Sequence, residues 1–303
     1  MKKQLFAIAA ATLAASLFPL GAAAQAVDTL AKIKASGTIT MGVRDSSGAL
    51  SYTLGDGKYT GFHVEVCNRV IANVEKAVGR KLEVKYQPVT SQNRIPLVQN
   101  GTVDIECGST TNNATRQKDV AFAVTTYVEE VRIAVKANSG ITSIAQLKDK
   151  SVATTTGTTS VQTLRKNERA TGVNFEEVFG KDHADSFLLL ESGRADAFVM
   201  DGQILAGNIA KSKAPADYKI VGEILSVEPI AIMLRKDDPA FKKLADDTLK
   251  DLMKSGEIQK IYEKWFVQPI PPKNVRVGLP ASESTKAAWA NPNDKPVEDY
   301  MKK

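Results

Sequence analysis

Residues 91–116 read SQNRIPLVQNGTVDIECGSTTNNATR, a helix–turn–strand unit that ends in a run of polar side chains. The pattern predicts a helix from Arg94 to Gln99, a turn at Gly101 and a short strand before Gly108. An arginine lies on either side of that strand, Arg94 before it and Arg116 after it. A guanidinium group presents a planar fork of donors that fits a carboxylate, and hydroxyls and free backbone N–H groups complete such a site. Two arginines therefore predict a ligand with two carboxylates.

The layout of this unit recurs further along the chain. Leu97–Asp104 is a helix end, a glycine and a strand that begins with an aspartate, and Leu189–Asp196 repeats that order. Five residues beyond each aspartate lies a polar strand end, Ser109 in the first copy and Asp201 in the second. Ligands of open α/β sheets bind at the carboxyl ends of strands. Two such units facing each other would place Ser109 and Asp201 on opposite walls of one cleft.

Strands and helices alternate along the whole chain, which predicts an α/β fold with mostly parallel sheets. Thr156–Ser160 is a Gly- and Thr-rich turn between a predicted strand and a helix. Free N–H groups at such a helix start suit an anion, and a plain threonine N-cap is the alternative. From Gln268 onward the chain is rich in proline and asparagine, and the pattern assigns no function to this tail.

The composition limits the function classes. The net charge of +6 comes from basic residues scattered among acids, without the aromatic-interleaved basic patch of a nucleic-acid binder. Neither His63 nor His183 has partners at metal-ligand spacing, so no metal or other cofactor is expected. His63, at the start of a helix, is expected on the surface. The two cysteines, Cys67 and Cys107, form either one disulfide or two separate buried thiols.

The N-terminus has the features of a secretory signal peptide, which we place at residues 1–26. A basic start at Lys2 and Lys3 precedes an apolar run and a small-residue stretch, and cleavage after Ala24 or Ala26 fits equally well. A single membrane anchor is the alternative. The apolar run is short for an anchor and no basic flank follows it, so we expect export with cleavage.

Several strings together resemble the glutamate/aspartate-binding periplasmic proteins of ABC importers. These strings are Ser91–Arg94, Glu106–Asn113, Gly157–Ser160, Lys181–His183 and Glu191–Arg194. The resemblance implies a two-lobed type II periplasmic binding fold, with a first lobe of residues 27–128 and 231–303 and a second lobe of residues 129–230. It also implies a monomer in the periplasm, with L-glutamate or L-aspartate as ligand and the membrane subunits of an ABC permease as partners.

Carried over position by position, the resemblance implies nine ligand-binding residues. Those for the α-carboxylate and its surroundings are Arg116, Ser109, Thr111 and Thr159, and Asp201 pairs with the α-ammonium. Those for the distal carboxylate are Arg44, Ser91, Arg94 and His183. A neutral His183 could donate an N–H to that carboxylate or could be structural. The alternative for Asp201 is an N-cap, and the alternative for Arg94 is a cap or a surface ion pair.

One departure from this family concerns the disulfide. Some members join the position of Cys107 to a cysteine near a late strand, but this chain has Ile232 there. Cys67 is then the available partner.

An enzyme on the same scaffold is the alternative function, because fold does not fix function. The predicted cleft holds arginines, hydroxyls and one acid, and no Ser–His–Asp or Cys–His order is suggested. We therefore expect no catalytic residue. A module that senses its ligand for a signalling partner is the third reading.

Overall fold

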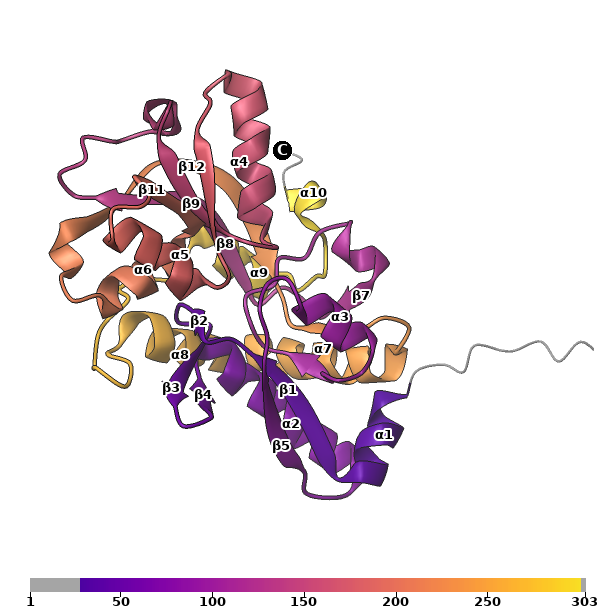
Figure 1. The fold of residues 1–303 in the computed structure, drawn as a ribbon. Coiled ribbons are helices and arrows are strands. Elements are labelled where there is room, and N and C mark those ends of the chain that lie inside the picture. The colour runs from indigo at the N-terminus through magenta and orange to yellow at the C-terminus, as the bar shows by residue number, and fades with distance from the viewer. Residues whose placement is uncertain (1–27, 301–303) are drawn as a thin grey trace, which may run out of the picture.

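Two five-stranded sheets organise the chain into two lobes (Figure 1). The computed structural model describes residues 28–300. The predicted signal peptide at 1–26 lies outside the described residues. Within them, no helix is long and apolar enough to cross a membrane.

The sheet of the first lobe combines strands from both ends of the chain. Its order is β5 (Glu83–Pro88), β1 (Thr38–Val43), β6 (Ile105–Glu106), β13 (Met233–Arg235) and β7 (Val120–Phe122). β1 runs parallel to β5 and β6, whereas β13 is antiparallel to β6 and β7. The larger core beside this sheet draws on α1 (Thr29–Ser36), α2 (Phe62–Val78), α7 (Pro239–Lys254) and α8 (Glu257–Tyr262). A smaller core lies under α3 (Arg94–Gln99).

The sheet of the second lobe is built from a continuous stretch of chain. Its order is β10 (Glu176–Gly180), β9 (Ser151–Thr155), β11 (Ala197–Asp201), β8 (Tyr127–Lys136) and β12 (Tyr218–Ile230). β9 is parallel to β10 and β11, and β8 is antiparallel to β11 and β12. One core contains Leu164 of α4 (Thr159–Thr171). The other contains residues of α5 (His183–Glu191) and α6 (Gly202–Lys211).

The remaining elements are short. A three-stranded sheet joins β2 (Ser46–Ser47), β3 (Ser51–Gly55) and β4 (Lys58–Thr60). The other segments are the 3-10 turns η1 (Arg116–Lys118), η2 (Ile144–Leu147) and η3 (Pro215–Asp217), the π-helical η4 (Glu263–Val267), α9 (Glu283–Ala290) and α10 (Val297–Tyr300).

The chain crosses between the lobes twice. It leaves the first sheet after β7 and enters the second with β8, so the first crossing is 123–126. It returns between β12 and β13, at 231–232. The predicted two-lobed α/β fold is confirmed, but both sheets are mixed rather than mostly parallel. The reason is that strands next to the crossings, β8, β12 and β13, pair antiparallel with their neighbours. We propose the division into 27–128 with 231–303, and 129–230. Its first boundary lies two residues inside β8, which begins at Tyr127.

The C-terminal tail packs against the first of these crossings. Trp289 Nε1 donates to the carbonyl of Thr126 at 2.7 Å, and the N–H of Val128 donates to Thr285 Oγ1 at 3.1 Å. The N–H of Val297 donates to the carbonyl of Asn112. The tail therefore ties the first crossing to a polar loop of the first lobe.

The first turn of α2 differs from the expectation. His63 is fully buried, with Nδ1 against the carbonyl of Gly108 and Nε2 against Thr126 Oγ1. The prediction that it lies on the surface is wrong, because this turn faces the junction of the lobes. Four residues further along α2, Cys67 forms a disulfide with Cys107, which confirms the single-bridge alternative.

Candidate functional site

A small cavity lies between the lobes, and seven of the nine predicted ligand-binding residues line it. Its volume is about 10 Å³, so the lobes are closed on it. The lining residues are Ser91, Arg94, Ser109 and Thr111 from the first lobe and Thr158, Thr159, His183, Met200 and Asp201 from the second. The structure thus brings Ser109 and Asp201 to one cavity from opposite lobes, as the repeated unit predicts. Arg44 and Arg116 lie beside it, as the contacts below show.

Several of these side chains belong to residues at the ends of helices and strands. Arg94 begins α3, Thr159 begins α4 and His183 begins α5. Asp201 ends β11 and precedes α6, yet its side chain makes no capping hydrogen bond to that helix. The N-cap alternative for Asp201 therefore lacks its defining contact. Arg94 is only 2 % exposed, which also argues against a surface ion pair.

Two buried arginines have unused donors. Among the described residues, Nε and Nη1 of both Arg44 and Arg94 are buried without a hydrogen-bond partner. Burial, with the charge of Arg116 second, holds the pKa of Arg94 well below its usual range. An unpaired buried charge is costly, and an anion between the lobes would supply the missing acceptors.

Arg116 joins the two lobes directly. Its Nη1 donates to the carbonyl of Thr111 at 2.9 Å, and its Nη2 donates to the carbonyl of Gly157 at 3.3 Å. Burial lowers the pKa of Arg116, although the charge of Glu228 acts in the opposite direction. The guanidinium group therefore lies beside the turn that leads into α4, where free backbone N–H groups at the helix start favour an anion.

Arg44 forms an interlobe ion pair. Its Nη2 donates to Ser91 Oγ at 3.1 Å and to Asp182 Oδ1 at 2.7 Å, and it lies 3.1 Å from His183 Nε2. Sequence reasoning missed Asp182 as a partner, although the string Lys181–His183 contains it. The pair fixes Arg44 of the first lobe against the start of α5 in the second.

His183 holds Arg44 in this structure. Burial, followed by the charge of Arg44, lowers the pKa of His183 to about 3, so its imidazole is neutral at pH 7. Arg44 has no acceptor, so in this contact Nε2 of a neutral ring accepts, sharing the two hydrogens of Nη2 with Ser91 and Asp182. Nδ1 then donates to Thr155 Oγ1, 3.0 Å away. This geometry favours the structural alternative for His183 over an N–H donated to the ligand.

Asp201 supplies the opposite charge. Burial, and then the negative charge of Glu228, raises the pKa of Asp201 to about 7, and the nearby arginines offset only part of this rise. A carboxylate held in this way gains from a cation next to it. The cavity therefore has unpaired guanidinium donors on one side and a carboxylate that favours an ammonium group on the other.

Glu228, on β12, is a site residue that sequence reasoning missed. It is 2 % exposed, and its Oε2 accepts from Thr111 Oγ1 at 2.6 Å and from Thr159 Oγ1 at 2.7 Å. No local pattern around Glu228 points to these threonines, which lie 117 and 69 residues away in the sequence. Only the assembled lobes bring the three side chains together.

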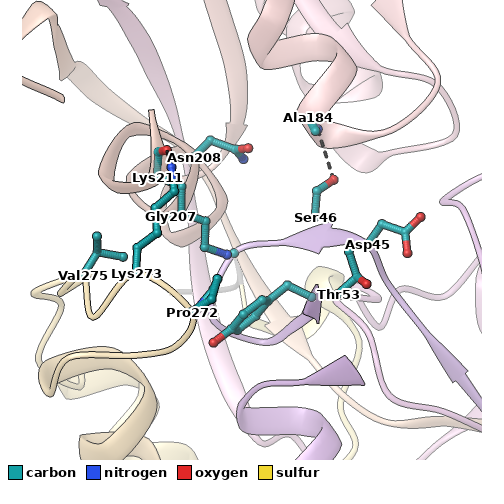
Figure 2. A pocket seen from close by; sticks show the side chains of 12 residues that line it. Asp45, Ser46, Thr53, Ala184, Gly207, Asn208, Lys211, Pro272, Lys273 and Val275 are labelled. Atoms are coloured by element: carbon teal, nitrogen blue, oxygen red, sulfur yellow. Dashed lines mark hydrogen bonds between the residues drawn. The ribbon is translucent and has the colours of Figure 1, made fainter. Parts of the chain in front are cut away.

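A second cavity of about 290 Å³ lies beside the cleft (Figure 2). Lys211 Nζ lies 3.7 Å above the ring of Tyr52, and the N–H of Ala184 donates to Ser46 Oγ at 3.0 Å. These contacts link the small sheet of the first lobe to α5 and α6. None of the nine predicted residues lines this cavity.

Two α/β lobes closed around a charged cavity define a two-lobed solute-binding protein. Residues 39–268 match the family described as "Bacterial extracellular solute-binding proteins, family 3", and the chain belongs to this family.

Relatives and solved structures agree with this membership. The chain is 46 % identical over 297 residues to the "Glutamate/aspartate import solute-binding protein" of Escherichia coli (strain K12), covering 97 % of this chain and 98 % of that one. It is 47 % identical over 273 residues to the "L-glutamate/L-aspartate-binding protein" of Pseudomonas aeruginosa, covering 89 % and 90 %. A mutant of ArgBP from T. maritima has a similar structure, with a TM-score of 0.70, 26 % identity and coverage of 78 % and 99 %.

Proposed function

We propose that this protein is the periplasmic receptor of an ABC importer for L-glutamate and L-aspartate. It captures the amino acid between its lobes, closes around it and delivers it to the membrane permease. The arrangement of charges in the cavity carries this proposal. Arg44 and Arg94 have buried donors without partners in the described part of the chain, whereas Asp201 lies on the opposite wall. An α-amino dicarboxylate matches both requirements.

The nine predicted residues divide between the two ends of this ligand. Arg116, with the backbone at the start of α4, receives the α-carboxylate. The resemblance places Ser109, Thr111 and Thr159 near that carboxylate. We place their hydroxyls around the α-amino group with Asp201, because both threonine hydroxyls donate to Glu228. Arg94, Ser91 and Arg44 face the distal carboxylate, with His183 holding Arg44. The names of the two relatives support the ligand, since both are described as glutamate/aspartate-binding.

Membership of a solute-binding family also favours a receptor over an enzyme. A receptor returns its ligand unchanged, whereas an enzyme on this scaffold would convert it. Incubation of the pure protein with glutamate, followed by full recovery of glutamate, distinguishes the two functions.

The distal charge provides the sharper test. Glutamine in place of glutamate would leave Arg44 and Arg94 buried and underpaired, at a cost of about 2–5 kcal/mol. Calorimetry on ligand-free protein should therefore show glutamine binding at least roughly a hundredfold more weakly than glutamate. Equal affinities for the two would refute the proposed specificity.

Arg94→Ala sharpens this experiment. The variant should lose about a hundredfold or more in glutamate affinity and much less in glutamine affinity, since glutamine has no distal charge. Arg169→Ala removes an exposed arginine from α4 and serves as the matched control, with no expected change.

A further inference from the structure

Glu228 connects the two lobes through hydroxyl groups. Its Oε2 accepts one hydrogen bond from Thr111 of the first lobe and one from Thr159 of the second, at 2.6 and 2.7 Å. Both threonines line the cavity, and their oxygens are 3.3 Å apart. Glu228 itself is 2 % exposed and lies just before the second crossing of the chain.

This arrangement determines what the two threonines can offer a ligand. A hydroxyl has one hydrogen and two lone pairs. When both hydrogens are directed at Glu228, the hydroxyls cannot donate to each other or to a ligand. Only oxygen lone pairs remain for the cavity. Asp201 lies on the same cavity and adds two more acceptor oxygens.

We propose that Glu228 is a positioning residue that turns the Thr111 and Thr159 hydroxyls into acceptors and so makes the site select ligands with an α-ammonium group. The inference rests on the proposed function, since it concerns the amino end of the same ligand. Without Glu228 both hydroxyls can rotate and donate, and the site then tolerates a ligand that lacks the ammonium group. The shared acceptor also requires both lobes to be in place, so this selectivity exists only in the closed form.

The test compares L-glutamate with glutarate, the same dicarboxylate without its amino group. In Glu228→Gln the side chain keeps its shape but loses its charge, and one of its two acceptor oxygens is replaced by an NH2 group that can donate to the threonine hydroxyls. The ratio of the glutarate and glutamate dissociation constants should fall about tenfold, the size of one hydrogen bond to a charged group. Glutarate affinity itself should stay constant or rise. An unchanged ratio overturns the inference. A variant that is merely misfolded would lose both ligands alike, and the second variant, Glu228→Asp, then decides.

Glu228→Asp separates positioning from charge. It keeps the carboxylate but shortens the side chain, so the carboxylate oxygen lies farther from the hydroxyls of Thr111 and Thr159. The ratio should fall as it does in Glu228→Gln. Retention of the wild-type ratio in Glu228→Asp would show that charge alone provides the selectivity and would overturn the positioning role. Failure of the wild type to bind glutamate or aspartate would instead refute the proposed function, so the two failures are distinguishable.

Discussion

At the scale of single residues, the space between the closed lobes contains buried guanidinium groups whose hydrogen-bond donors are only partly paired. Arg44 is fully buried, and within residues 28–300 only Nη2 of its three guanidinium nitrogens has partners, on Ser91, Asp182 and His183. Leaving a buried donor unsatisfied costs about 1–3 kcal/mol, and more for a charged group. Closure without a ligand is therefore penalised, and closure around a dicarboxylate removes the penalty. The same unsatisfied guanidinium donors then account for both ligand selectivity and lobe closure.

A second residue-scale consequence concerns His63 and acid stability. Burial lowers the pKa of His63 to about 4 from the 6.5 of an exposed histidine, partly offset by its bond to the carbonyl of Gly108. The folded state thus favours the neutral ring. This preference contributes to the free energy of unfolding. The contribution is fully present above pH 6.5 and is lost as the pH falls from there through about 4. The loss amounts to about 3 kcal/mol of unfolding free energy.

Urea unfolding at several pH values from 7 to 4 measures this loss. The variant His63→Gln should lose less stability over that range than the wild type, whatever its stability at pH 7. His183 is present in both proteins, so its contribution to the pH dependence of stability is the same in each. Identical pH slopes for the two proteins would contradict the assignment.

At the scale of elements, the disulfide fixes α2 to the strand end that carries Ser109. Cys67 and Cys107 are 40 residues apart, and a loop of that length is worth about 4 kcal/mol by the chain-entropy relation. The double variant Cys67→Ala/Cys107→Ala should therefore have a lower melting temperature than the oxidised wild type. Reduced wild type is the control and should melt close to the variant. An unchanged melting temperature in both would show that α2 packing alone holds this strand end.

The element scale also explains what the sequence could and could not predict. Periodicity and turn residues predicted the helix at Arg94 and the polar ends at Ser109 and Asp201, because each depends on a few neighbouring residues. The acceptor role of Glu228 and the pairing of Arg44 with Asp182 depend on lobe-to-lobe contacts between residues 117 and 138 positions apart in the sequence. No local pattern encodes such contacts. The surface prediction for His63 was wrong for the same reason.

At the scale of the whole molecule, the two lobes meet through a small set of close contacts outside the cavity. Gln203 of α6 accepts from the N–H of Ala49 at 3.1 Å, and Lys211 at the end of α6 lies over the ring of Tyr52. The C-terminal tail contacts the same junction through the first crossing. Closure therefore involves the start of α5 and one face of α6 as well as the crossing segments, and it is open to a direct test.

Gly207 is the place to test it. A Cβ atom there would lie 2.9 Å from Gly48 Cα in the opposite lobe, too close for the closed form without a shift of backbone. Gly207 is within α6, where alanine stabilises a helix by about 1 kcal/mol relative to glycine. Gly207→Ala should therefore leave the ligand-free protein equally or more stable, yet lower glutamate affinity about tenfold, since overpacking costs about 1–3 kcal/mol. Small-angle scattering should show a smaller glutamate-induced decrease in the radius of gyration than in the wild type. If the variant binds and contracts like the wild type, the contact between Gly48 and Gly207 does not limit closure. The closed form must then accept a larger distance between α6 and Gly48 than the structure shows.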